Sequence, residues 1–121
     1  MRRVIISGGG TGGHIYPAIT IARAIADIEP TEFLYVGSKI GLENTLIPKE
    51  GLPFVTLDVR GLERKISVRN LVTLGKTAAS LIKAEGIIHK FKPDVVIGTG
   101  GFVCGPVLLA ASLSGVPSLI Q

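Results

Sequence analysis

The amino-acid sequence predicts an α/β fold: a Rossmann-like parallel sheet with helices on both faces. Short runs rich in Val and Ile alternate with longer amphipathic segments along the chain, and this alternation is typical of right-handed βαβ units. The short runs are nearly continuous in their apolar character, as in strands that are covered on both faces. We therefore expect a doubly wound sheet.

Strands are expected where the short apolar runs occur. Five are predicted, over residues 4–7, 33–36, 54–58, 94–97 and 117–121. In the doubly wound order the first and fourth strands are neighbours. The segments that follow these two strands are therefore expected to face the same crevice.

Helices are expected between the strands. Four are predicted, over residues 17–28, 42–50, 68–91 and 106–113. Pro17 suits the first turn of a helix, and apolar residues recur after it at helical spacing. We expect residues 1–121 to form one domain, truncated from a longer protein, because the chain ends at an apolar strand.

The composition excludes several classes of protein. A length of 121 residues suffices for one domain with a core, and 46% hydrophobic residues exclude a disordered chain. A single cysteine, Cys104, excludes a disulfide scaffold and a multi-cysteine zinc site. No apolar run approaches the ~18 residues of a membrane-spanning helix. These features predict a soluble cytoplasmic domain.

A glycine loop follows the first predicted strand. Five of the six residues 8–13 are glycine. Ligands of α/β sheets bind at the carboxyl ends of strands, where backbone amides at the start of the next helix favour phosphate. We therefore interpret Gly10, Thr11, Gly12 and Gly13 as ligand-binding residues.

This loop also contains the dinucleotide-binding pattern, with glycine at positions 8, 10 and 13. That pattern needs an acidic residue at the end of the second strand to hold a ribose. Residues 35–38, where the second strand ends, include no acid. A dinucleotide cofactor is therefore disfavoured.

A second glycine loop, residues 98–106, follows the fourth predicted strand. If both loops face one crevice, their backbone amides suit a diphosphate or a sugar phosphate. We interpret four residues of the second loop as part of the same site: Thr99, Gly100, Gly101 and Phe102.

His14 ends the first loop at the predicted crevice. A neutral imidazole there is suited to take a proton from a sugar hydroxyl, so His14 is the candidate catalytic base. A capping or packing role is the alternative. We interpret Cys104 as a small buried or loop-lining residue, because no neighbour in sequence activates its thiol.

The positive charge of the chain is concentrated in one segment. The net charge is +4, but residues 60–92 hold eight basic and two acidic residues, a charge of +6, which leaves −2 elsewhere. Within the helix over 68–91, basic residues recur every seven positions and form one stripe: Arg69, Lys76, Lys83 and Lys90. Two apolar lines run beside it, a predicted core stripe (Val68, Val72, Gly75, Ala79, Ile82 and Gly86) and a second line (Leu74, Leu81 and Ile88).

This helix has two interpretations. One is a buried helix with a solvated lysine edge. The other is a patch that rests on an anionic membrane surface, formed by Arg69, Leu74, Lys76, Leu81 and Lys83. Nucleic acid is a disfavoured partner, because the stripe contains no aromatic residue.

The two glycine loops resemble those of the MurG family. Residues 9–14 and 92–106 carry the resemblance, residues 47–51 and 60–62 add to it, and it covers essentially the whole chain. MurG enzymes are inverting GT-B glycosyltransferases with two Rossmann-like domains. They transfer N-acetylglucosamine (GlcNAc) from UDP-GlcNAc to undecaprenyl-diphospho-muramoyl-pentapeptide, which converts lipid I into lipid II in peptidoglycan synthesis.

The resemblance implies that residues 1–121 are the acceptor-binding half, without the C-terminal UDP-sugar-binding domain and inactive alone. It places both loops near the acceptor diphosphate, with the residues matched by Thr11, Gly12 and Gly13 also beside the donor, and His14 as the candidate base. It further implies no metal, no cofactor and a peripheral position on the cytoplasmic face of the cell membrane.

Two other functions remain open from the sequence. The chain can belong to another lipid- or small-molecule-directed GT-B glycosyltransferase, or it can be a non-catalytic anchoring subunit of a split transferase. Assays of the full-length protein with different acceptors distinguish another GT-B glycosyltransferase from a MurG enzyme. The length of the reading frame tests whether the chain is a subunit of a split transferase.

Overall fold

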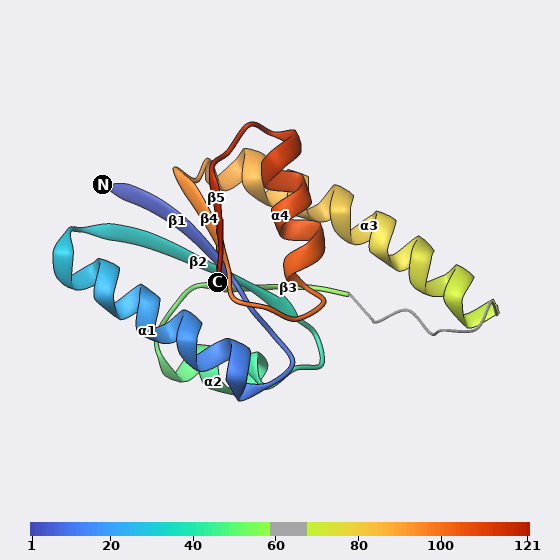
Figure 1. The fold of residues 1–121 in the computed structure, drawn as a ribbon, viewed down its shortest axis with the longest axis horizontal. Coiled ribbons are helices and arrows are strands. Elements are labelled where there is room, and N and C mark those ends of the chain that lie inside the picture. The colour runs from blue at the N-terminus through green and yellow to red at the C-terminus, as the bar shows by residue number, and fades with distance from the viewer. Residues whose placement is uncertain (59–67) are drawn as a thin grey trace.

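A computed structural model shows a five-stranded parallel sheet in the order β3-β2-β1-β4-β5 (Figure 1). The structure describes the backbone of residues 1–58 and 68–121 and the side chains of residues 1–58 and 78–121. The strands are β1 (Arg2–Ser7), β2 (Thr31–Ser38), β3 (Phe54–Leu57), β4 (Val95–Gly98) and β5 (Ser118–Ile120). The predicted parallel sheet is confirmed, and β1 and β4 are neighbours as expected.

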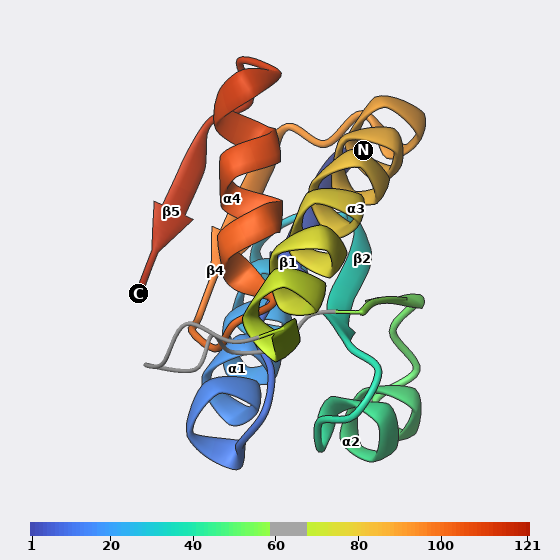
Figure 2. The same ribbon diagram turned by 90° about the vertical axis from the view of Figure 1, so that its right-hand side faces the viewer.

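Helices cover both faces of the sheet. They are α1 (Gly12–Ile28), α2 (Glu43–Lys49), α3 (Val68–Phe91) and α4 (Cys104–Leu113). α1 and α2 lie on one face, and α3 and α4 lie on the other (Figure 1 and Figure 2). The part of the chain that the structure describes contains no helix with the length and hydropathy of a transmembrane segment.

The central strand β1 contributes to both hydrophobic cores. Successive side chains of a strand point to opposite faces. Ile5 is buried in one cluster with Ile88 of α3 and Val107 of α4. Its neighbour Ile6 is buried in the other cluster with Ile15 of α1. The continuous apolar run over residues 4–6 of this strand therefore has the predicted cause.

The predicted starts of two helices are wrong. α1 begins at Gly12 rather than Pro17, and α4 begins at Cys104 rather than Pro106. Glycine is a poor helix former, which favoured a loop at these positions, but burial of Ile15 against the sheet stabilises the first turn of α1. Gly12 and Gly13, at the end of the first glycine loop, therefore form the first turn of α1. The backbone amides of a first turn have no acceptor within the helix.

α3 is apolar on two sides, and the side that packs on the sheet is not the predicted one. Ile82 is 71% exposed, and Ala79 and Gly86 are exposed as well. Ala84 and Ile88 are buried in the core instead. The predicted core stripe therefore faces outward wherever its side chains are described.

The lysine stripe lies on an exposed flank of α3. Lys83 and Lys90 are exposed, and the ammonium of Lys83 donates a hydrogen bond to the Thr56 carbonyl oxygen at 2.7 Å. Leu81 packs against the core, which argues against its predicted place in a membrane patch. Several predicted residues lie outside the described side chains: residues 60–62, Val68, Arg69, Val72, Leu74, Gly75 and Lys76.

The assignment of the α3 faces predicts a contrast between two isoleucines. Ile88→Ala should lower the free energy of unfolding by about 2–5 kcal/mol, because it removes methylene and methyl groups from a closed core. Ile82→Ala should change it by less than about 0.5 kcal/mol, because that side chain is exposed. Urea unfolding followed by circular dichroism measures both. A larger loss of stability in Ile82→Ala than in Ile88→Ala would instead support the core stripe predicted from sequence.

Candidate functional site

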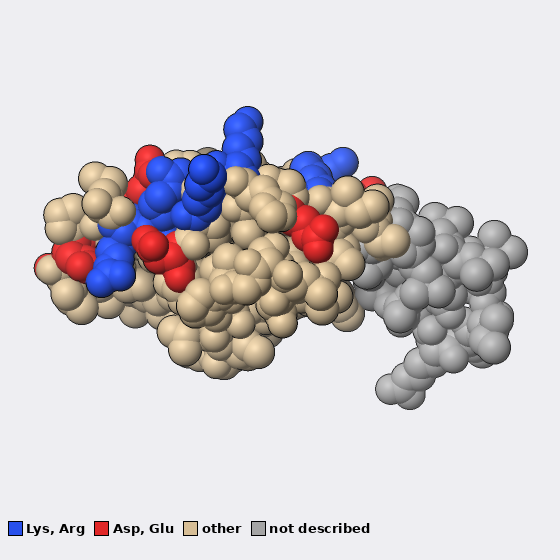
Figure 3. Space-filling view, turned by 90° about the horizontal axis from the view of Figure 1, so that it is seen from above, with Lys and Arg blue, Asp and Glu red and all other residues tan. Residues whose placement is uncertain are grey.

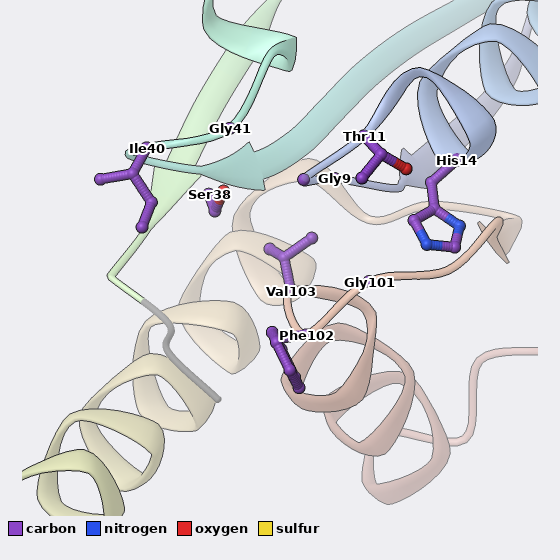
Figure 4. Close-up of a pocket in the computed structure, with 10 residues that line it drawn as sticks. Gly9, Thr11, His14, Ser38, Ile40, Gly41, Gly101, Phe102 and Val103 are labelled. Carbon is purple, nitrogen blue, oxygen red and sulfur yellow. The ribbon is translucent and has the colours of Figure 1, made fainter. Parts of the chain in front are cut away.

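A cavity of about 470 Å³ lies at the carboxyl ends of the strands (Figure 4). Three connections line it: β1–α1, β2–α2 and β4–α4. This is the edge of an open α/β sheet at which ligands bind. The lining residues are Gly9, Gly10, Thr11, His14, Ser38, Ile40, Gly41, Gly101, Phe102 and Val103.

The two glycine loops are joined by main-chain hydrogen bonds. The Gly9 amide donates to the Gly100 carbonyl oxygen at 3.1 Å, and the Thr99 amide donates to the Ser7 carbonyl oxygen at 2.9 Å. The expectation that both loops face one crevice is confirmed. A side chain at Gly101, whose φ is +94°, would overlap the backbone of Gly9, so this close approach requires glycine.

Thr99 and Gly100 lie behind the cavity and support His14. The Thr99 hydroxyl donates to the His14 carbonyl oxygen at 2.6 Å, and the His14 ring nitrogen Nδ1 lies 3.1 Å from the Thr99 carbonyl oxygen. A side chain at Gly100 would occupy the place of the His14 ring. Neither Thr99 nor Gly100 lines the cavity itself.

This contact decides which nitrogen of His14 is free to accept a proton. A carbonyl oxygen only accepts hydrogen bonds, so Nδ1 is the donor and carries the proton when the ring is neutral. Nε2 then keeps its lone pair. The imidazole is half-buried at the cavity wall, which is a suitable arrangement for a general base that is oriented by a second group.

The start of α1 has backbone amides without acceptors in the helix. Thr11 is the N-cap residue, and its side chain makes no capping hydrogen bond. The amides of Gly12 and Gly13 belong to the first turn, where the helix supplies no acceptor for them. Gly12 and Gly13 lie next to the lining residues Thr11 and His14 rather than in the lining.

The β2–α2 connection was missed by the sequence analysis. Ser38, Ile40 and Gly41 form one wall of the cavity, facing Phe102 across it (Figure 4). Ile40 is 80% exposed and Phe102 is 71% exposed, so the mouth of the cavity is apolar. No glycine run or charge pattern marks residues 38–41, which is why the sequence alone did not include them.

Cys104 and Tyr35 have structural roles beneath the loops. The Cys104 thiol is buried and lies 3.0 Å from the Ser7 carbonyl oxygen, in agreement with its predicted packing role. The Tyr35 hydroxyl donates to the Gly8 carbonyl oxygen at 2.6 Å. Burial, assisted by the nearby charge of Glu43, raises the pKa of Tyr35, so this hydroxyl stays a donor.

Metal-binding side chains do not gather in the described part of the chain. There, no group of three or more His, Cys, Asp or Glu residues is placed to hold a metal ion. His89 is exposed on α3 and is not among the cavity residues.

Comparison with known proteins places the chain among glycosyltransferases. Residues 4–121 match the family model described as glycosyltransferase family 28 N-terminal domain. The chain is 53% identical over 120 residues to an enzyme of Thermoanaerobacter named UDP-N-acetylglucosamine–N-acetylmuramyl-(pentapeptide) pyrophosphoryl-undecaprenol N-acetylglucosamine transferase. It is 47% identical over 120 residues to a Bacillus anthracis enzyme of the same name. Each match covers 98% of this chain and 33% of the relative, so the chain spans about a third of their length.

Solved structures agree with this placement. MurG of Acinetobacter baumannii has a TM-score of 0.86 and 31% identity, over 99% of this chain and 35% of that chain. The Staphylococcus aureus MnaA–UDP structure, with a TM-score of 0.68, 16% identity and coverage of 99% of this chain and 29% of that chain, shares the fold. The Rossmann-like fold predicted from sequence is confirmed.

The buried Tyr35 predicts a specific dependence of stability on pH. Tyr35→Phe should lower the free energy of unfolding by about 1–3 kcal/mol at neutral pH, because the buried Gly8 carbonyl loses its donor. The folded protein holds the Tyr35 proton more tightly than the unfolded chain, whose tyrosine pKa is about 10. The stabilisation is therefore complete below about pH 10 and is lost as the pH rises further.

Urea unfolding of both proteins from neutral pH to about pH 11 measures this effect. The gap in stability between wild type and Tyr35→Phe should narrow above about pH 10. A gap that stays constant over this range, or no gap at neutral pH, would contradict the assigned hydrogen bond.

Proposed function

Because the chain belongs to the glycosyltransferase family 28 N-terminal domains, we propose that it is the acceptor-binding half of an N-acetylglucosaminyltransferase of peptidoglycan synthesis. The full-length enzyme transfers GlcNAc from UDP-GlcNAc to undecaprenyl-diphospho-muramoyl-pentapeptide. The observation that carries this proposal is the cavity that the two hydrogen-bonded glycine loops form with the β2–α2 connection. The 53% identity to transferases of that name supports it.

In this proposal the start of α1 binds the acceptor diphosphate. A helix N-terminus offers unpaired amides and a partial positive charge, both of which favour phosphate. Gly10, Thr11 and Gly101 line the cavity next to that N-terminus, and Gly12 and Gly13 supply its first-turn amides. Phe102 borders the cavity mouth, where an apolar or sugar face of the acceptor can rest.

His14 is the proposed base. Nε2 takes the proton of the acceptor C4 hydroxyl while that oxygen bonds to the anomeric carbon of GlcNAc. The bond from the anomeric carbon to the UDP oxygen breaks, its electron pair leaves with UDP, and the configuration inverts. The Thr99 carbonyl accepts the hydrogen bond from Nδ1, which holds the ring and stabilises the imidazolium that forms. The proposal assigns no metal or cofactor.

The exposed flank of α3 is the proposed membrane contact. Lys and Arg side chains, with some acids among them, lie along one edge of the face in Figure 3. On α3 itself, the side chains of Lys83, Lys90 and Ile82 are exposed. Arg69 and Lys76 extend the stripe in sequence. Each cation near an anionic surface contributes about 1 kcal/mol, which suits a peripheral enzyme at the cytoplasmic face of the cell membrane.

The role of His14 is tested by His14→Ala in the full-length protein, assayed with UDP-GlcNAc and the lipid-linked acceptor. Loss of a general base should lower kcat by about 10²–10⁴-fold, with the KM for acceptor changed by less than about threefold, because the amides of α1 remain. His89→Ala is the matched control, since His89 is exposed on α3.

Unchanged kcat in His14→Ala would refute the base. Failure of the wild-type enzyme to use this acceptor, together with transfer to another one, would replace the proposed function by that of a different glycosyltransferase.

The membrane contact is tested by charge reversal. Lys76→Glu/Lys83→Glu should weaken binding to vesicles that contain phosphatidylglycerol, most strongly at low salt, because salt screens exposed charges. Lys39→Glu/Lys49→Glu changes the net charge equally at exposed positions near α2 and is the control. Equal loss in both variants, or no loss in the first, would count against a docking flank on α3.

A further inference from the structure

Glu43 is a buried carboxylate at the side of the cavity. It is the first residue of α2, and its exposed fraction is 0%. A carboxylate in such a place is costly unless its oxygens accept hydrogen bonds. Two groups supply them: the Ser38 hydroxyl donates to Oε1 at 2.8 Å, and the Gly10 amide donates to Oε2 at 3.0 Å.

These two bonds join two connections that wall the cavity. Gly10 belongs to the β1–α1 loop and Ser38 to the end of β2. Both residues line the cavity, whereas Glu43 lies behind them. Glu43 therefore fixes the first glycine loop relative to the β2–α2 wall without touching the cavity.

The space around this carboxylate is kept free by glycines. A Cβ atom on Gly9, Gly37 or Gly41 would overlap the side chain of Glu43. These glycines come from three places in the chain: the first loop, strand β2 and the β2–α2 connection. The sequence analysis assigned Gly41 no role, and the packing of Glu43 gives it one.

The bond to Gly10 also determines which amides remain for a ligand. Gly10 has a φ of +89°, and its amide points inward to Glu43. It is therefore not a free phosphate donor. The amides of Gly12 and Gly13, two and three residues later, start α1 and keep their donors free of helix partners.

We infer that Glu43 is a positioning residue for the acceptor diphosphate: it holds the Gly10 amide inward and thereby aims the start of α1 into the cavity. This inference rests on the proposed function. The role is one of hydrogen-bond geometry rather than charge. In Glu43→Gln the amide oxygen accepts from Gly10, and the amide nitrogen donates to the Ser38 hydroxyl, which also accepts.

The test compares KM values for acceptor and donor in the full-length protein. Glu43→Ala should raise the KM for acceptor at least tenfold and change the KM for UDP-GlcNAc less than threefold. Glu43→Gln should keep the KM for acceptor within threefold of wild type. Ile47→Ala is the matched control, because Ile47 is equally buried on α2 and contacts the core instead. Its acceptor KM should stay within threefold.

Ser38→Ala extends the test to a milder change, in case Glu43→Ala does not fold. It removes one of the two bonds to Glu43 and should raise the KM for acceptor severalfold. The inference is overturned if the KM for acceptor does not change in Ser38→Ala, if Glu43→Gln is as impaired as Glu43→Ala, or if Ile47→Ala shows the same rise. A wild-type protein without GlcNAc transfer would instead overturn the proposed function.

Discussion

Main-chain hydrogen bonds between the two glycine loops hold the site together. The pairing of β1 with β4 extends as far as Ser7 and Gly98. Beyond the strands, the hydrogen bonds from Thr99 to Ser7 and from Gly9 to Gly100 continue it. Two connections far apart in sequence are therefore joined directly to each other. The same contact orients the His14 ring, and it leaves no room for a side chain at Gly100 or Gly101. The glycines thus serve loop packing as well as ligand approach.

The sequence predicts the topology well and the faces of α3 poorly. Strand positions follow from continuous apolar runs, because strands buried on both faces need them. The periodicity of α3 offers two apolar sides, and periodicity alone does not say which side meets the sheet. Residue size does not decide it either: Ala84 and the large Ile88 are both buried, whereas the small Ala79 is exposed. The buried face is the one that the fold places against β1 and α4, and a single sequence does not contain this arrangement.

The candidate site is also predictable from sequence only in part. Both glycine loops and His14 are recognisable in sequence, because they follow predicted strands at the edge of the sheet where ligands bind. Glu43 is not recognisable, since its partners Gly10 and Ser38 are joined to it only by the fold. The β2–α2 wall with Ile40 also depends on the fold. In this site the glycine loops are recognisable from sequence. The residue that positions the first loop, Glu43, is found only from its hydrogen bonds in the folded protein.

The proposed function requires that the first turn of α1 and the second glycine loop together hold the diphosphate of the acceptor. An amide NMR titration of the full-length protein with a water-soluble, short-chain acceptor diphosphate tests it most directly. We expect the largest shifts at Gly12, Gly13 and Gly101, while the Gly10 amide keeps its hydrogen bond to Glu43. Saturable binding that leaves these amides unshifted would contradict it.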